Sequence, residues 1–155
     1  MLRRQDATVA AAESITGGLV AAALTAVPGS SATFRGGVVA YASDLKVGLL
    51  GVDPALLSLR GAVDPDVARA MALGVRELLS ATYGIATTGV AGPDTQDGQP
   101  VGNVHLAVSG PGGVAVESRQ LAGDRWAIRE TCVTRALDLL RRRLSGDRPA
   151  GEGRA

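Results

Sequence analysis

Aromatic residues and net charge are both scarce in this sequence, and each shortage excludes a class of partner. Only 3% of the 155 residues are aromatic, so the chain offers no row of rings on which the bases of a nucleic-acid strand could stack. The formal net charge is +1, which gives no strong field to attract nucleic acid or an anionic membrane. We therefore expect neither nucleic acid nor a membrane as a partner.

Cysteine and histidine each occur once, as Cys132 and His105. A single cysteine cannot form a disulfide within the chain, and with one histidine it cannot build a structural zinc site. We expect no structural zinc and, as the default, a cytoplasmic location. His105 alternates out of phase with Val104, Leu106 and Val108, so we expect it to face away from that apolar stripe and to have no chemical role.

Uninterrupted apolar runs are also missing. Residues 14–34 carry no charge and are nearly long enough to span a bilayer, but the pair Gly17 and Gly18 and the segment 28–31 interrupt them. We expect a buried helix followed by a loop. The two arginines near the start resemble the beginning of a signal peptide, but Asp6 and Glu13 leave too short an apolar core for one.

The chain does contain enough aliphatic residues for the core of one domain, since 46% of its residues are hydrophobic. The pattern predicts strands over residues 8–11, 37–42, 83–89, 103–109 and 114–121, and helices over 18–26, 45–50 and about 124–144, with two more that begin at Asp53 and Asp64. Residues 110–113 join the last two strands as a hairpin. This alternation predicts an α/β fold, a three-layer α/β/α sandwich on a mixed, mostly parallel sheet of about five strands. We expect one domain over residues 1–144 and a disordered tail over residues 145–155.

Reactive groups in open α/β sheets gather in the loops that follow the carboxyl ends of strands, and the first such loop here contains Ser14. A hydroxyl just before a helix start lies where free backbone N–H groups converge, so an anion or a developing oxyanion is stabilised there. Gly17 and Gly18 let a substrate approach the backbone closely. A plain helix N-cap explains the serine equally well, and this loop alone leaves both interpretations open.

The second loop holds Lys46, which is the only lysine in the chain, and Tyr41, one of two tyrosines. Arginine does not release its proton in a protein, whereas a desolvated lysine can, so a lone lysine near a strand end suggests a general base or proton relay. Together with Ser14 these groups can perform acyl transfer without histidine: the serine attacks, and the lysine or the tyrosine moves the proton. The alternative is a solvated helix lysine beside a half-buried strand tyrosine.

The third loop, TGVAGPD over residues 88–94, resembles a phosphate-binding turn but matches neither the Walker pattern nor GxGxxG. Arg125 and Arg129 follow at the start of the last helix, where a helix N-terminus and a guanidinium together can bind a phosphate. Arginine on an exposed helix face is more commonly solvated, and we interpret Arg141, Arg142 and Arg143 in that way.

These segments also occur in a specific order. AESITGG, PGSSATFRGGVVAYASDLKVGLLGV, TTGVAGPD, PVGNVHLAV and GDRWAIRETCVTRAL resemble the carboxy-terminal domain of the CinA family, and the resemblance covers residues 8–144. Stand-alone members of that family are nicotinamide-nucleotide amidohydrolases. The resemblance implies hydrolysis of the carboxamide of nicotinamide mononucleotide to nicotinate mononucleotide and ammonia, with no metal and no cofactor. The family's catalytic serine, tyrosine and lysine fall on Ser14, Tyr41 and Lys46.

The resemblance and the loop pattern together predict a set of substrate-binding residues. N–H groups near residues 16–18 would hold the oxyanion, and the remaining positions would hold the ribose and the phosphate of a nucleotide substrate. The set comprises Thr16, Gly17, Gly18, Ser30, Ser31, Thr88, Gly89, Ala91, Gly92, Arg125 and Arg129. A homodimer or larger homo-oligomer is expected from the resemblance.

The sequence departs from the family pattern at several positions. Ile15 replaces a frequent cysteine, residues 42–44 alter the segment between tyrosine and lysine, and Asp64 stands where a serine is common. Only residues 1–6 precede the first expected strand, where members usually carry a helix. The main alternative function is therefore a catalytically silent nucleotide-binding or regulatory module, against which the joint presence of Ser14, Tyr41 and Lys46 argues. A purely structural protein is the third possibility, and the glycines at the strand ends argue against it.

Overall fold

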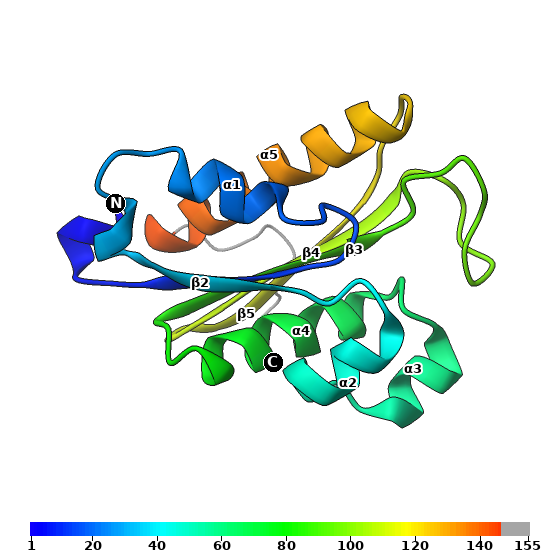
Figure 1. The fold of residues 1–155 in the computed structure, drawn as a ribbon, viewed down its shortest axis with the longest axis horizontal. Helices are drawn as coiled ribbons and strands as arrows, with labels where there is room; N and C mark the ends of the chain where they lie inside the picture. Colours follow the sequence, from blue (N-terminus) through cyan, green and yellow to red (C-terminus); the bar gives the residue numbers. More distant parts are fainter. Residues whose placement is uncertain (147–155) are drawn as a thin grey trace.

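Helices cover both faces of a single five-stranded sheet in the computed structural model, which describes residues 1–146 (Figure 1). The strands are β1 (Val9–Glu13), β2 (Phe34–Val39), β3 (Tyr83–Gly89), β4 (Asn103–Gly110) and β5 (Gly113–Gln120). The predicted three-layer α/β/α sandwich is confirmed. Most of the tail that the sequence predicts to be disordered, residues 147–155, lies outside the described residues.

The sheet has the strand order β2-β1-β3-β4-β5. β1 pairs in parallel with both β2 and β3, whereas the β3–β4 and β4–β5 pairs are antiparallel. It follows that β4 alone runs against the other strands, which confirms a mixed sheet whose strands mostly share one direction. The carboxyl ends of β1, β2 and β3 therefore meet at one edge of the sheet, and the loops that follow them lie together.

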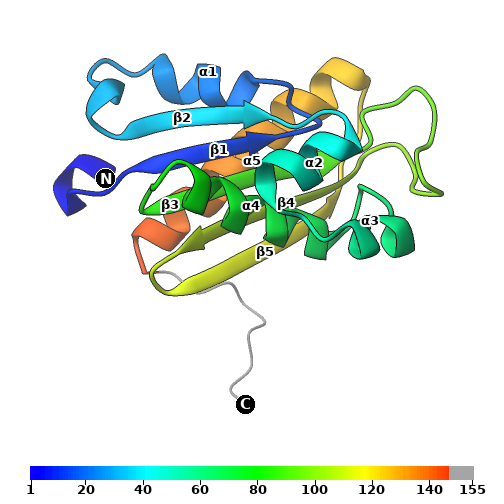
Figure 2. The same ribbon diagram turned by 60° about the horizontal axis from the view of Figure 1, so that its bottom comes forward.

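Two helices pack on one face and three on the other. α1 (Leu19–Thr25) and α5 (Arg125–Leu144) cover the first face, and α2 (Ser43–Leu50), α3 (Pro54–Arg60) and α4 (Pro65–Leu78) cover the second (Figures 1 and 2). The expected helix starts are confirmed: the side chains of Asp53, Asp64 and Asp124 each accept a backbone N–H bond as N-caps. Aspartate and serine both cap helices well, so the departure at Asp64 leaves α4 with a side-chain cap.

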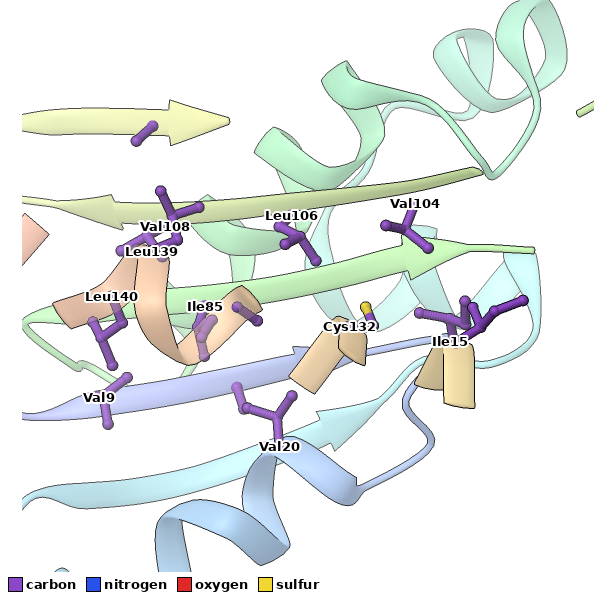
Figure 3. Packing of buried hydrophobic residues seen from close by; sticks show 14 of the residues in the cluster. Val9, Ile15, Val20, Ile85, Val104, Leu106, Val108, Cys132, Leu139 and Leu140 are labelled. Atoms are coloured by element: carbon purple, nitrogen blue, oxygen red, sulfur yellow. The ribbon is translucent and has the colours of Figure 1, made fainter. Parts of the chain in front are cut away.

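The apolar core has one layer on each side of the sheet. Along β1 the side chains alternate, so Val9 and Ala11 face α5 while Ala10 and Ala12 face α4. The α5 side holds the larger residues, among them Leu106, Leu139 and Leu140 (Figure 3). The α4 side is built mainly from alanine and valine, which lets α4 approach the sheet closely.

That close approach depends on glycine at one position of β3. A Cβ built on Gly84 would lie 2.1 Å from the backbone oxygen of Ala72 in α4, far inside van der Waals contact. Only a residue without a side chain fits between the strand and the helix here.

The first two strands differ from their predicted bounds. β1 continues to Glu13 because that residue pairs with β2 and β3 at once. β2 was expected over residues 37–42 but runs from Phe34 to Val39. The register shift at Val9 and Ala10, together with a φ of +148° at Gly36, lets pairing begin before the glycines. Tyr41 therefore lies beyond the strand, in the loop that leads to α2.

The single histidine and cysteine are buried in different layers. His105 faces away from the stripe of Val104, Leu106 and Val108, as predicted, and its Nδ1 lies 2.7 Å from Ser118 Oγ. Burial lowers the pKa of His105, and the Asp64 carboxylate opposes that shift. Cys132 packs in the α5 layer (Figure 3), where burial raises the pKa of its thiol to about 12.

Candidate active site

Ser14 begins a tight turn between β1 and α1 (residues 14–18), which we call the nucleophile turn after the role that the sequence predicts for Ser14. The N–H of Ser14 donates to Thr87 O at 3.0 Å, which ties the residue to β3. Helix α1 starts at Leu19, and its N-cap is Gly18, with no side-chain cap bond. The helix-cap interpretation of Ser14 is therefore wrong, and its hydroxyl is free for another task.

Glu13 replaces the missing helix cap. Its carboxylate is 1% exposed and accepts hydrogen bonds from the N–H groups of Gly18, Val20 and Ala21 and from the hydroxyl of Thr16, at 2.6–3.0 Å. The first N–H groups of a helix have no intrahelical acceptor, and a carboxylate there also matches the helix dipole. Glu13 thus fastens the nucleophile turn to α1.

Lys46 lies next to Ser14 although 32 residues separate them in the chain. It is 1% exposed, and its Nζ donates to Ser14 Oγ at 3.1 Å, to Ala40 O at 2.7 Å and to Tyr41 O at 3.2 Å. Burial lowers the pKa of the Lys46 amine, and the carboxylate of Asp97 opposes part of that shift. The predicted serine–lysine pair is therefore formed, with the lysine in the desolvated state that base catalysis needs.

Tyr41 reaches the same edge of the sheet but contacts different groups. Its side chain is 58% exposed, and its hydroxyl accepts a bond from Arg125 Nη2 at 3.1 Å. Arg125 Nη1 donates in turn to Gly92 O at 2.5 Å. Tyr41 contacts Lys46 only through its backbone carbonyl, so its hydroxyl belongs to a bridge across the pocket rather than to the serine–lysine pair.

A pocket of about 300 Å³ opens beside Ser14. Its wall consists of Ser14, Ile15, Tyr41, Arg125 and the loop residues 89–96. Of the expected substrate-binding residues, Gly89, Ala91, Gly92 and Arg125 are in this wall. The strand-end rule therefore led to residues that line a pocket.

Two expected binding residues, Thr16 and Thr88, point into the protein. Both are buried. The Thr16 hydroxyl bonds to Glu13 and to Thr87 Oγ1, and the Thr88 hydroxyl donates to Ala62 O at 2.7 Å. Neither is in the pocket wall, so these side chains support the loops and do not face a ligand.

The glycines of the nucleophile turn also have their N–H groups engaged. Gly17 N–H donates to Ser14 O at 3.1 Å, and Gly18 N–H donates to Glu13 at 3.0 Å. The two glycine N–H groups are therefore not free for an oxyanion, contrary to the prediction for these residues. The N–H groups of Ile15 and Thr16 have no acceptor among residues 1–146, and of these two residues Ile15 is in the pocket wall.

Arg129 is turned away from the pocket as well. Its Nε donates to Ile15 O and its Nη2 to Thr16 O, both at 3.0 Å. The guanidinium carbon lies 5.6 Å from the centre of the Trp126 ring. Arg129 is therefore placed against the nucleophile turn and not in the pocket wall, where a phosphate ligand would lie.

Ser30 and Ser31 lie at the opposite edge of the sheet. They form a short 3₁₀ turn, Ser30–Ala32, just before β2. The parallel pairing places Phe34 beside Val9, at the start of β1, whereas Ser14 follows the end of β1. Residues that precede a parallel strand fall at its amino edge, so the structure does not bring this pair to the pocket of the same chain.

Asp97 was not singled out from the sequence but lies at the tip of the glycine-rich loop (residues 90–102). Gln96 and Gln99 pair across the tip, and Asp97 and Gly98 both have positive φ, of 51° and 74°. This is the geometry of a type I′ turn, for which Asp-Gly is a strong signal. Asp97 Oδ2 accepts the N–H of Ala62 at 3.1 Å, which tethers the loop to the segment before α4.

Residues 1–146 contain no group of three or more histidine, cysteine, aspartate or glutamate side chains that could hold a metal ion. Within the same range, none of the helices combines the length and the apolar character that a membrane crossing requires.

Comparison with known sequences gives one family. The CinA C-terminal domain matches residues 1–144. A CinA-like protein of Frankia casuarinae is 56% identical over 146 residues, which is 94% of this chain and 34% of that protein. One from Solibacter usitatus is 48% identical over 147 residues, 94% of this chain and 35% of that protein. The chain thus spans about a third of the length of the curated relatives it matches.

Solved structures agree with this match. The competence damage-inducible protein A of Klebsiella pneumoniae has a TM-score of 0.89 at 32% identity, over 93% of this chain and 90% of that chain. The competence/damage inducible protein CihA of Agrobacterium tumefaciens has a TM-score of 0.86 at 39% identity, over 90% and 86%.

Proposed function

The chain belongs to the CinA C-terminal domain family, and on that premise we propose that it hydrolyses the carboxamide of nicotinamide mononucleotide to nicotinate mononucleotide and ammonia. One observation carries the proposal: a buried lysine amine bonds to the hydroxyl of Ser14 in the wall of a pocket. The proposal concerns this domain, since the curated relatives are about three times as long and their whole activity is a separate question.

The three acceptors around Lys46 define where its proton goes. A protonated amine has three N–H donors, and Ser14 Oγ, Ala40 O and Tyr41 O accept all three. A neutral amine has two donors and one lone pair. The two carbonyl oxygens can only accept, so they keep the two N–H groups, and the lone pair faces the one partner that can donate, the hydroxyl of Ser14. The neutral form of Lys46 is thus a general base aimed at the serine.

The reaction then follows from these groups. Ser14 Oγ attacks the carboxamide carbon while its proton passes to Lys46, and a tetrahedral oxyanion forms. Lys46 returns the proton to the amide nitrogen, the C–N bond breaks, and ammonia leaves an acyl-enzyme. Water attacks the acyl carbon with Lys46 again as base, which releases the carboxylate and restores Ser14. The Ile15 N–H, from the residue after the nucleophile, is our candidate oxyanion donor.

The rest of the pocket supplies binding groups. Among residues 1–146, Arg125 is the one guanidinium in the wall, and we assign it to the phosphate of the substrate. The exposed ring of Tyr41 can lie against the positively charged pyridinium ring. Since the Tyr41 hydroxyl bonds to Arg125, we assign Tyr41 to this binding wall and proton transfer to Lys46. We further propose that the protein forms a homodimer or larger homo-oligomer, which light scattering would test.

The test is ammonia release from nicotinamide mononucleotide, with free nicotinamide assayed beside it. We expect turnover of the mononucleotide, loss of turnover in Ser14→Ala, and wild-type turnover in Ser43→Ala, a change at an exposed serine at the start of α2. Tight nucleotide binding without ammonia release from the intact protein would instead support a silent binding module.

A further inference from the structure

Arg129 is the residue whose observed contacts differ most from its expected role. It lies one helical turn after Arg125 in α5, and residues four apart share a helix face. Arg125 reaches the pocket wall, but Arg129 donates hydrogen bonds from the Nε–Nη2 edge of its guanidinium to Ile15 O and Thr16 O. That edge is one of those by which arginine binds a phosphate bidentately. The contacts therefore argue for a task other than phosphate binding.

The two carbonyls that Arg129 binds determine how the nucleophile turn is oriented. In a trans peptide the C=O of one residue and the N–H of the next point in opposite directions. Holding Thr16 O therefore directs the Gly17 N–H the other way, where it donates to Ser14 O at 3.1 Å. Holding Ile15 O fixes the preceding peptide plane in the same manner. Two consecutive planes after Ser14 are thus fixed by one side chain.

Other contacts hold the remaining sides of the turn. Ser14 N–H bonds to β3, and Gly18 N–H bonds to Glu13. The side that faces α5 has Arg129. A Cβ on Gly17, whose φ is +57°, would lie 3.2 Å from Arg129 Nη2, so the turn and the guanidinium are packed closely against each other.

The positive charge of Arg129 lies beside the same two peptide groups, those that contain Ile15 O and Thr16 O. Within residues 1–146 no carboxylate forms an ion pair with it, and its hydrogen bonds there go to two carbonyls of the nucleophile turn. A cation bound to a carbonyl polarises the peptide that contains it. The guanidinium therefore acts on the backbone beside Ser14 both through geometry and through its charge.

We propose that Arg129 is a positioning residue that fixes the peptides after Ser14 and so keeps Ser14 Oγ within hydrogen-bond reach of Lys46 Nζ. The proposal rests on the function assigned above, in which Ser14 is the nucleophile. It predicts that a change at Arg129 slows the chemical step for every amide that the pocket accepts. A change at a residue that binds the phosphate would affect only substrates that carry a phosphate.

The kinetic test compares three variants on nicotinamide mononucleotide and on its phosphate-free nucleoside. Arg129→Lys keeps the charge but cannot span two carbonyls, so we expect kcat to fall about 10²-fold on both substrates with little change in KM. Arg125→Ala should raise KM for the mononucleotide more than for the nucleoside. Arg135→Lys, at an exposed position of the same helix, is the control and should match the wild type. A rise in KM for the mononucleotide alone in Arg129→Lys would overturn the proposal.

Two further measurements do not depend on the substrate. The rate at which a small fluorophosphonate labels Ser14 should fall in Arg129→Ala and recover when millimolar ethylguanidinium is added, a rescue that a general loss of folding would not show. A crystal structure of Arg129→Lys should show the 3.1 Å contact between Ser14 and Lys46 broken or lengthened. Unchanged labelling together with an unchanged contact would refute the positioning role. If the wild type is labelled but releases no ammonia from either substrate, the proposed function fails, and slower labelling of the variant still supports Arg129.

Discussion

The nucleophile turn and the glycine-rich loop lie at the same edge of the sheet and are held in different ways. The nucleophile turn is tied to β3 through Thr87, to α1 through Glu13 and to α5 through Arg129. The tip of the glycine-rich loop is exposed. The base of the loop bonds to Asn103, Gln120 and Leu121, and nearer the tip it is tethered by Arg125 at Gly92 and by Asp97 at Ala62. On the proposed function, the turn that carries the reacting serine is held by three different elements, whereas the loop that would meet the rest of the substrate has an exposed tip with fewer contacts.

The largest expected effect comes from removing the base. Lys46→Met keeps a long apolar stem in the buried site but has no proton to exchange, so we expect kcat for ammonia release to fall at least about 10³-fold. The variant should keep the secondary structure of the wild type by circular dichroism. Activity within about tenfold of the wild type would contradict the assignment of Lys46 as base.

The same pair of proteins tests the pKa of Lys46 through stability. Burial lowers the pKa of the Lys46 amine in the native state below its value in the unfolded state, which is near 10.5. The unfolded state then holds more protons, so the free energy of unfolding of the wild type rises with pH through the lowered pKa and up to about 10.5. Lys46→Met lacks this pH-dependent contribution to the free energy of unfolding. Urea denaturation at a series of pH values up to about 10.5 should show the wild type gaining stability relative to the variant as the pH rises, and parallel curves over the whole range would contradict it.

Glu13→Ala and Asp97→Ala compare the anchors of the two loops. Glu13→Ala leaves three backbone N–H groups and a hydroxyl without their acceptor, and we expect a loss of about 3–5 kcal/mol in the free energy of unfolding. Asp97 accepts one bond at an exposed tip, so Asp97→Ala should cost about 1 kcal/mol or less. Equal losses in denaturant titrations would show that the two loops are anchored alike.

Two glycines allow a matched comparison of the loops. Gly17 and Gly98 both have positive φ, of +57° and +74°, but a Cβ at Gly17 would lie 3.2 Å from Arg129, whereas a Cβ at Gly98 would have open space. Alanine at either position should cost about 1–2 kcal/mol from backbone strain. Only Gly17→Ala should also lower kcat, because it displaces Arg129. A comparable drop in kcat for Gly98→Ala would show that the loop tip is as closely coupled to the chemistry.

The smallest expected effect concerns the charge of Asp97 in the glycine-rich loop, which acts on Lys46 beside Ser14. Asp97→Asn keeps an acceptor for Ala62 but removes the carboxylate that opposes the lowering of the Lys46 pKa. The pKa of Lys46 should fall further, so the acidic limb of the profile of kcat against pH should move to lower pH. Asp44→Asn, an exposed change in the same helix as Lys46, is the control and should leave the limb in place. A shift to higher pH would contradict the sign of this coupling.

The sequence predicted the fold and the centre of the site because both depend on regular patterns. The bounds of β3 agree with the prediction, Tyr83–Gly89. The pairing of Ser14 with Lys46 followed from the rule that parallel strands end at one edge. The same rule, applied to Ser30 and Ser31, would have placed them at the far edge, because they precede β2 instead of following it.

The pattern of residues in the sequence did not show in which direction individual side chains point. Arg125 and Arg129 share a helix face, yet one reaches the pocket wall and the other the nucleophile turn, which depends on how α5 sits against β1. Thr88 points to Ala62 because the segment before α4 lies on that side of β3. The Asp97-Gly98 turn did have a signal in the sequence, the Asp-Gly pair between two glutamines, which the prediction of a plain glycine-rich loop overlooked.

If the proposed function holds, the carboxylate of Glu13 also couples the unfolding of α1 to the loss of ammonia release. The same side chain receives the N–H groups of Val20 and Ala21 in the helix and the hydroxyl of Thr16 beside the serine, so a fluctuation that opens the first turn of the helix also releases the nucleophile. In native-state hydrogen exchange, the amides of Val20 and Ala21 should therefore begin to exchange at the denaturant concentration at which ammonia release stops, while the amides of the central strands stay protected. The helix would then unfold together with the site, as one cooperative unit ahead of the sheet.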